Sequence, residues 1–204
     1  MPRPVAAWWV KYGSGAADAG SQNLTPTNVT AVGWSGGFNG KDSQMTTSGP
    51  VLDTGPGGSF TIAAAVFLVD TASFETIVSQ DGTRNSAFYL QYSSADKRWA
   101  FSRVASDQPN PAAARALSLA PPATLKWVQL VGVFNARTSE LKLYVDSKLQ
   151  STVSYRTPYA THGKFALGRG QYLGASADWF HGDIGDVKVY AQALTTAQVQ
   201  KIPW

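Results

Sequence analysis

The side chains best suited to chemistry lie together in the run 179–190. A histidine, His181, sits between an aromatic residue, Trp179, and two acids, Asp183 and Asp186. A histidine beside a carboxylate can take up or release a proton near neutral pH. Two acids at the mouth of a strand can also contribute oxygen ligands to a hard divalent cation. The run therefore offers an acid/base group and a candidate metal site.

Hydrolysis of the familiar types is not indicated by the rest of the chain. Glycosidases use two closely facing carboxyl groups, whereas Glu75 and Glu140, the only glutamates, fall on separate predicted strands without that spacing. No nucleophile elbow, a serine held between a strand and a helix, is predicted for a serine triad. His181 remains the candidate catalytic residue, with Asp81 or Asp178 as alternative polar groups in such a pocket.

Short strands are the elements that must position these side chains. Glycine (19 residues), proline (11) and aromatic residues (12%) are plentiful, and long helical periodicity is nearly absent, which favours strands joined by turns. The apolar run 59–69 predicts a central strand buried on both faces. Residues 98–104 alternate, so Ala100 and Ser102 should share one face. Thr195 or Thr196 can cap the one predicted helix, 196–201.

The remaining segments complete the pattern of an all-β protein. Further strands are predicted at 5–12, 30–38, 44–47, 75–79, 87–92, 126–134, 140–145, 150–155, 164–167 and 179–190. Residues 13–28 and 50–58 are predicted as connecting loops, and 108–122 as a long loop at the rim. The spacing of strands and turns predicts an antiparallel two-sheet jelly-roll sandwich with one short C-terminal helix. No linker divides the chain, so 1–204 is predicted as a single domain.

Composition excludes several classes of function. The chain has no cysteine, so disulfides and thiolate metal ligands are excluded. The net charge of +4 arises from singly scattered lysines and arginines, which argues against nucleic acid as a partner. No stretch approaches the roughly 20 apolar residues of a membrane span. The first residues lack the features of a signal peptide, which predicts a cytoplasmic protein if Met1 is the native start, and an extracellular one if the chain is an excised module.

A series of short motifs in a fixed order gives the chain a family resemblance. These motifs are Gly33-Trp34, SGPVLDT at 48–54, SFTI at 59–62, VSQDG at 78–82, FYLQY at 88–92, WAFS at 99–102, WVQLVGVF at 127–134, LKLYV at 141–145, GRG at 168–170, and FHGDIGDVKVY at 180–190 with Ala193-Leu194. In this order the chain resembles the LamG-like jelly-roll domains of the concanavalin A-like lectin/glucanase superfamily, in the form common in secreted actinobacterial proteins. The resemblance implies two facing sheets, one of them concave. This fold occurs in binding modules and in enzymes alike.

The resemblance also implies a structural calcium ion, and no organic cofactor. In similar domains an Asp of the closing run holds calcium together with groups of an early loop. Asp186 matches that position best, with Asp183 as the alternative, and Asp18, Asn39 and Asp42 are early-loop candidates. The chain departs from the family pattern here, because His181 replaces the usual proline and Gly185 replaces one acid of the usual pair.

A ligand surface is predicted on the concave sheet. Sugars bind where an aromatic face stacks on C–H surfaces and where planar side chains bond to hydroxyl groups. The candidate ligand-binding residues are Gln80, Asp81, Arg84, Tyr89, Gln91, Arg103, Arg169, Tyr172 and Trp179.

Three hypotheses follow for function. The first is a non-catalytic recognition domain that binds a glycan or a small molecule, alone or beside other domains of a longer precursor. The second is a repurposed enzyme of specialised metabolism, a cyclase or isomerase with an aromatic pocket and His181 as its acid/base group. The third is an adhesion domain whose rim loop, 108–122, binds protein.

Overall fold

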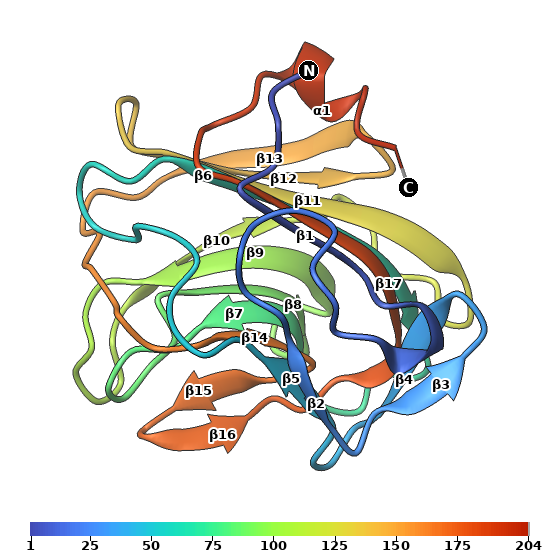
Figure 1. Cartoon of the computed structure of the whole chain (residues 1–204). Helices are drawn as coiled ribbons and strands as arrows, with labels where there is room; N and C mark the ends of the chain where they lie inside the picture. The colour runs from blue at the N-terminus through green and yellow to red at the C-terminus, as the bar shows by residue number, and fades with distance from the viewer. Residues whose placement is uncertain (204) are drawn as a thin grey trace.

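Two large antiparallel sheets face each other in the computed structural model, which describes residues 1–203 (Figure 1). The first sheet contains β1 (Ala6–Trp9), β3 (Thr30–Val32), β4 (Ser35–Asn39), β6 (Phe60–Leu68), β11 (Trp127–Asn135), β12 (Glu140–Val145), β13 (Lys148–Ser154) and β17 (His181–Tyr190). The second contains β2 (Thr25–Thr27), β5 (Gln44–Thr46), β7 (Glu75–Gln80), β8 (Phe88–Ser93), β9 (Arg98–Val104), β10 (Ala113–Leu117) and β14 (Phe165–Leu167). The predicted jelly-roll sandwich is therefore confirmed.

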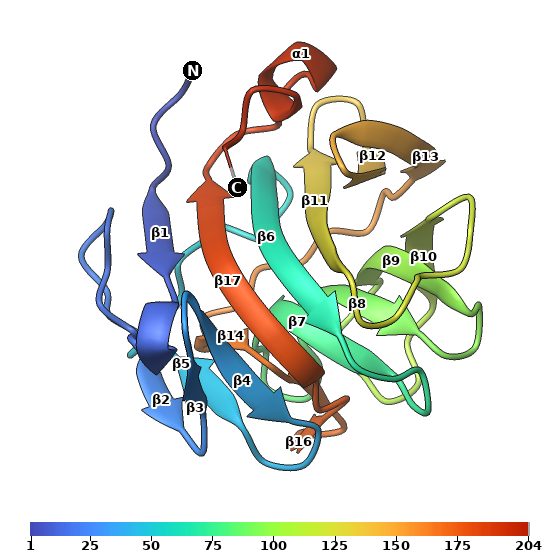
Figure 2. The same ribbon diagram turned by 90° about the vertical axis from the view of Figure 1, so that its right-hand side faces the viewer.

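The order of strands places distant segments side by side. The first sheet runs β13-β12-β11-β6-β17-β4-β3, with β1 paired to β17, and the second runs β10-β9-β8-β7-β14-β5-β2. Figure 2 shows β1, β17, β6 and β11 as neighbours across the first sheet. A separate hairpin, β15 (Gly170–Tyr172) and β16 (Ala175–Ala177), stands on the side of the second sheet that faces away from the first (Figure 1).

The central strand predicted from the apolar run is β6. It pairs with β11 on one side and β17 on the other, so its backbone groups are satisfied within the sheet. Ile62 and Val66 point between the sheets, whereas Ala63 points to the outer face and is also buried. Burial on both faces explains why the segment is a continuous apolar run and does not alternate.

The core between the sheets is rich in aromatic rings. Phe60 of β6 lies 5.2 Å from Phe88, 6.2 Å from Phe101 and 5.7 Å from Phe134, measured between ring centroids. These rings come from both sheets and are fully buried. Each contributes about 1.5–3 kcal/mol by leaving water. This cluster holds the two sheets at a fixed spacing.

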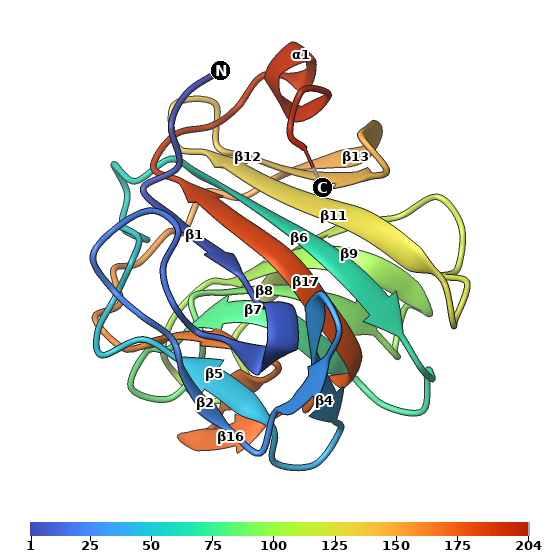
Figure 3. The same cartoon turned by 45° about the vertical axis from the view of Figure 1, so that its right-hand side comes forward.

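The short C-terminal helix α1 (Thr196–Val199) covers part of the outer face of the first sheet (Figure 3). Thr195 accepts a hydrogen bond from the backbone of Gln198, and the side chain of Gln198 accepts one from the backbone of Thr195. This reciprocal capping box confirms Thr195 as the cap. Leu194 and Val199 pack with Tyr144 in a second, smaller core. No helix within residues 1–203 is long and apolar enough to cross a membrane.

The strand β2 lies within the predicted loop 13–28, and two further differences from the sequence prediction matter for the site. The predicted rim loop 108–122 contains β10, an edge strand paired to β9 from Ala113–Val104 to Leu117–Ala100. Its alanines have weak strand propensity, so the ladder to β9 and not the local sequence decides its structure. The β15–β16 hairpin was also not predicted, because three-residue strands carry almost no periodic signal.

Candidate functional site

A cavity of about 350 Å³ opens on the outer face of the second sheet. Alternation along β8 builds its floor: Phe88 and Leu90 enter the core, so Tyr89 and Gln91 face outward. Ser102 extends the floor from β9. The remaining lining comes from Phe74, Val104, Pro111, Ala113, Arg115, Tyr172 and Asp178.

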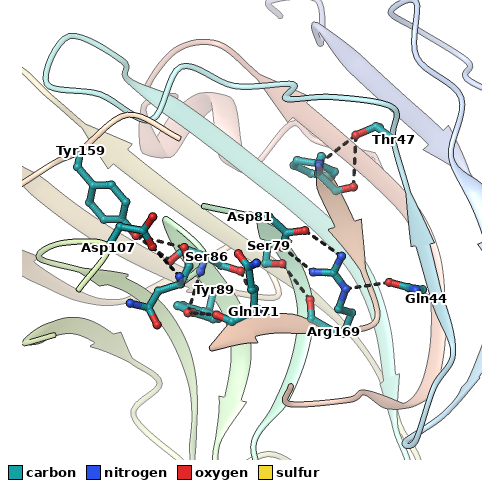
Figure 4. A network of polar contacts seen from close by, with 12 residues as sticks. Gln44, Thr47, Ser79, Asp81, Ser86, Tyr89, Asp107, Tyr159, Arg169 and Gln171 are labelled. Carbon is teal, nitrogen blue, oxygen red and sulfur yellow. Dashed lines mark hydrogen bonds and ion pairs between the residues drawn. The ribbon is translucent and has the colours of Figure 1, made fainter. Parts of the chain in front are cut away.

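Hydrogen bonds fix the polar floor. The Thr76 hydroxyl donates to Gln91 Oε1 at 3.2 Å, and Gln91 Nε2 donates to the Ser102 hydroxyl at 3.3 Å. The Tyr89 hydroxyl donates to the carbonyl of Gln171 at 2.7 Å and accepts from the Ser86 amide at 3.1 Å (Figure 4). Burial raises the pKa of Tyr89, which keeps its hydroxyl neutral. The floor is therefore rigid before any ligand arrives.

The walls carry an aromatic ring and opposite charges. The Tyr172 hydroxyl donates to Asn110 Oδ1 at 2.8 Å, which holds the ring at the edge of the cavity. Arg115 lies 3.8 Å from the Asp96 carboxylate, a loose pair that leaves its guanidinium accessible. Asp178 has φ of +54°, and its carboxylate makes no hydrogen bond within the described part of the chain. Burial raises the pKa of Asp178, as expected for a carboxylate that lacks a partner.

Three of the predicted ligand-binding residues meet in this cavity: Tyr89, Gln91 and Tyr172. Ser102 lies on the face opposite to Trp99 and Phe101, as the alternation of 98–104 predicted, and the structure shows that this face points outward. The sequence does not indicate Arg115, because residues 108–122 are predicted to form a loop. Phe74 and Pro111 were missed because isolated loop residues carry no pattern.

Two predicted ligand-binding residues do not lie on the ligand face, which corrects the sequence interpretation. Gln80 is fully buried, and its amide bonds to the backbone of Val51 and Leu52 at 2.9–3.0 Å. Arg103 is also fully buried, with its guanidinium 4.4 Å from the Phe134 ring centroid and 2.6 Å from the carbonyl of Thr54. Both point between the sheets, because alternation places every second residue of β7 and β9 there.

Asp81 and Arg169 bond to each other. Arg169 donates to both Asp81 oxygens at 2.5 and 2.9 Å and to Gln44 Oε1 at 2.8 Å (Figure 4). This buried fork ties the end of β7 to the segment after β14. Arg84 is exposed, and Trp179, which forms a bridge with Thr76, is half-buried; neither lines the cavity.

His181 has a carboxylate partner, though not its sequence neighbour Asp183. His181 Nδ1 lies 2.7 Å from Asp70 Oδ2, and its backbone amide donates to Glu75 Oε2 at 3.0 Å. Burial raises the pKa of Glu75 to about 8. A backbone bond from Ala72 and the contact with His181 lower the pKa of Asp70. The described cavities do not include His181 in their linings, so an acid/base role stays a prediction.

The pattern Gly-x-Ser-x-Gly does occur, at 33–37, but it is not a nucleophile elbow. It leads from a turn into β4, and Ser35 is buried there with its hydroxyl donating to the carbonyl of Val32 at 2.9 Å. A strand–turn–helix setting is required to expose the serine of a hydrolase.

The predicted calcium ligands do not converge. Asp186 forms an ion pair with Lys188. Asn39 Oδ1 accepts three backbone amides of its own turn, and Asn39 Nδ2 donates to Asp42 at 2.8 Å. Asp183 lies beside Gly37 on the outer face of the first sheet. Within residues 1–203 no three acidic, histidine or cysteine side chains form a group suited to a metal. These residues do not fit a calcium ion as a set.

Comparison with solved structures finds the same fold in carbohydrate-active and toxin proteins. Domain 4 of AbnA, a GH43 extracellular arabinanase from Geobacillus stearothermophilus solved with arabinotriose, aligns with a TM-score of 0.72 at 13% identity over 97% of each chain. The binding domain of botulinum neurotoxin serotype G aligns with a TM-score of 0.72 at 12% identity, over 97% of this chain and 50% of the toxin chain. Trypanosoma rangeli sialidase in complex with the inhibitor DANA aligns with a TM-score of 0.68 at 12% identity, over 96% of this chain and 32% of the sialidase.

Sequence comparison names the family directly. No curated protein sequence matches the chain. The family profile of the concanavalin A-like lectin/glucanases superfamily, Laminin_G_3, matches residues 39–200. That match includes both central strands of the first sheet and every strand that lines the cavity. The chain therefore belongs to the concanavalin A-like lectin/glucanase superfamily.

Proposed function

We propose that the chain is a non-catalytic carbohydrate-binding domain whose ligand enters the cavity on the outer face of the second sheet. The observation that carries the proposal is Asp178, a half-buried carboxylate that makes no hydrogen bond within the described part of the chain and faces a cavity that also holds aromatic rings and the Gln91 amide. A carboxylate that loses part of its water without gaining a protein partner is destabilised, and hydroxyl groups of a sugar would supply hydrogen bonds to it. The volume of about 350 Å³ falls in the range of small-ligand sites.

The other lining residues suit the two kinds of surface that a sugar presents. The rings of Tyr172 and Phe74 offer faces for C–H groups, whereas Gln91 and Ser102 offer amide and hydroxyl groups to ring hydroxyls. Arg115 adds a forked donor at the rim. Because the polar floor is already held by internal hydrogen bonds, a ligand would lose little affinity to ordering side chains.

A binding role fits the cavity better than glycoside hydrolysis. Hydrolysis needs a pair of carboxyl groups across the scissile bond, and Asp178 is the only acid among the described lining residues. The structural relatives include a domain solved with arabinotriose and a sialidase solved with sialic acid. At 12–13% identity they establish the fold, and they support carbohydrate as the ligand class to test first.

Affinity electrophoresis in gels that contain arabinan, xylan, mixed-linkage β-glucan or galactomannan tests the proposal. Asp178→Asn keeps the side-chain shape and tolerates the positive φ. It removes charge-assisted bonds worth about 1.5–3 kcal/mol, so the association constant obtained from the retardation should fall at least tenfold. Tyr172→Ala should weaken it about three- to tenfold through lost stacking. Arg156→Ala, an exposed arginine outside the cavity, serves as the control. Unchanged retardation in both cavity variants would refute the assignment.

A further inference from the structure

A second cavity lies on the outer face of the first sheet, on the opposite side of the sandwich. Its volume is about 570 Å³, and two half-exposed tryptophans line it: Trp9 of β1, which is 46% exposed, and Trp34, in the turn between β3 and β4, which is 45% exposed. The polar lining consists of Asp18, Asp186 and Lys188. Nothing in the proposed function uses these residues. Exposed indoles around a cavity are typical of binding surfaces.

Gly185 explains how Trp34 is placed. A Cβ atom at position 185 would lie 2.5 Å from Cζ3 of the Trp34 ring, so glycine at this position lets the indole approach β17 closely. Trp34 also stacks on Trp127, with 4.1 Å between ring centroids, and Trp127 contacts Phe67 at 5.7 Å. Glycine at position 185 therefore makes room for the Trp34 ring beside β17.

Trp9 is fixed in a different way. Its backbone amide donates to the Asp18 carboxylate, and the ammonium of Lys11, which does not line the cavity, lies 4.5 Å from its ring centroid. The interaction with Lys11 uses one face of the indole. Each indole thus already contacts another side chain, which lowers the entropy that it would lose on binding a ligand.

The charges in the lining restrict the chemistry of the ligand. Asp186 pairs with Lys188, which also donates to the carbonyl of Pro203 at 2.9 Å, and Asp18 is bonded to the Trp9 amide. Among the described lining residues, these contacts leave no free cation to attract an anion. Two carboxylates also oppose insertion into lipid, because burial of a charge in hydrocarbon is costly. A neutral ligand with an apolar face and hydroxyl edges satisfies both conditions.

We infer that the Trp9–Trp34 cavity is a second saccharide-binding site, which takes a neutral sugar ring stacked on Trp34 with its hydroxyls toward Asp186 and Lys188. It stands apart from the cavity at Asp178 and does not depend on it. Two sites on opposite faces let one domain engage two segments of polysaccharide. Binding to a polymer should therefore exceed binding to a trisaccharide through multivalency.

The test uses the same four polysaccharide gels with the full chain. Its variants are Trp34→Ala, a first-cavity variant (Tyr172→Ala with Asp178→Asn), and the combination of all three changes. Tyr12→Ala is the matched control, because Tyr12 is 71% exposed near the tryptophans but does not line the cavity. Gly185→Ala keeps every aromatic side chain and displaces Trp34. We expect Trp34→Ala and Gly185→Ala to weaken retardation at least threefold, Tyr12→Ala to leave it unchanged, and the triple variant to abolish what the first-cavity variant retains.

Three results would overturn the second site. These are retardation of Trp34→Ala equal to wild type in every gel, a triple variant equal to the first-cavity variant, or no retardation of the wild-type chain. Sedimentation with phosphatidylcholine–phosphatidylserine vesicles tests whether the tryptophans bind a membrane surface instead of a saccharide. If Trp34→Ala loses vesicle binding without any change in the gels, the second saccharide site is refuted. A loss in Trp34→Ala with an unaffected first-cavity variant supports the second site and refutes the proposed function alone.

Discussion

Removal of the Asp81 carboxylate separates a structural role for the Asp81–Arg169 pair from a role in ligand contact. The two side chains are 11% and 6% exposed, and Asp81 accepts both bonds of the guanidinium fork, at 2.5 and 2.9 Å. In Asp81→Ala the buried guanidinium keeps its bond to Gln44 alone. Loss of one partner of a buried pair costs about 3–5 kcal/mol, because the other charge is left without compensation. For a domain of this size that corresponds to a fall in Tm of about 6–20 °C.

Urea unfolding followed by tryptophan fluorescence measures this loss. Asp81→Leu with Arg169→Met removes both charges and should cost less than the single change, with a coupling energy of at least about 1 kcal/mol. Arg84→Ala, an exposed arginine outside the pair, is the control. If Asp81→Ala lowers the free energy of unfolding by less than about 1 kcal/mol, the structural role of the pair is refuted. Weaker saccharide binding at unchanged stability would show instead that Asp81 contacts the ligand.

Three further predictions concern stability. Burial raises the pKa of Glu75 from 4.5 to about 8, so between these pH values the folded protein binds one more proton than the unfolded chain. The free energy of unfolding should therefore fall as pH rises from about 4.5 to about 8, with a slope of at most about 1.4 kcal/mol per pH unit. Glu75→Gln should flatten that slope in urea titrations at pH 5, 7 and 9; an unchanged slope would contradict the assignment. Gly132→Ala places a Cβ 2.5 Å from the Phe101 ring and should lower the free energy of unfolding by about 1–3 kcal/mol. An unchanged free energy of unfolding would show that the Phe101 ring can move aside without cost. Calcium should leave Tm unchanged relative to EDTA, because Asp186 is already paired; stabilisation near 2.7 kcal/mol, expected at a hundredfold excess over Kd, would instead establish a calcium site.

The fold could be predicted from sequence because its signals are local and repeated. The apolar run of β6, the alternation of β9 and the capping threonine before α1 each follow from burial or hydrogen bonding of neighbouring residues. β10 could not be predicted in this way, because its structure comes from a ladder to β9 that local sequence does not encode. It is also the strand that supplies Arg115 to the cavity.

The site was only partly predictable for a similar reason. Tyr89 and Gln91 were found because polar and aromatic residues amid an apolar strand pattern face outward or need partners. Arg103 and Gln80 look the same in sequence, yet they face the core, where both bond to backbone carbonyls and Arg103 also lies against aromatic rings. Which face a residue takes depends on strand register, and register is fixed by pairing across the sheet. The acid near His181 is Asp70, 111 residues away in sequence, a contact that no local pattern reveals.

The most direct test of carbohydrate binding is a ¹⁵N–¹H NMR titration of the wild-type chain with arabinotriose, xylotriose and cellotriose. With at least one of them, we expect the amide signals of Gln91, Ser102 and Arg115 to shift in a saturable manner, and the same titration of Asp178→Asn to show shifts at least tenfold weaker at equal ligand concentration. No shift of these three residues with any trisaccharide would contradict carbohydrate binding in this cavity.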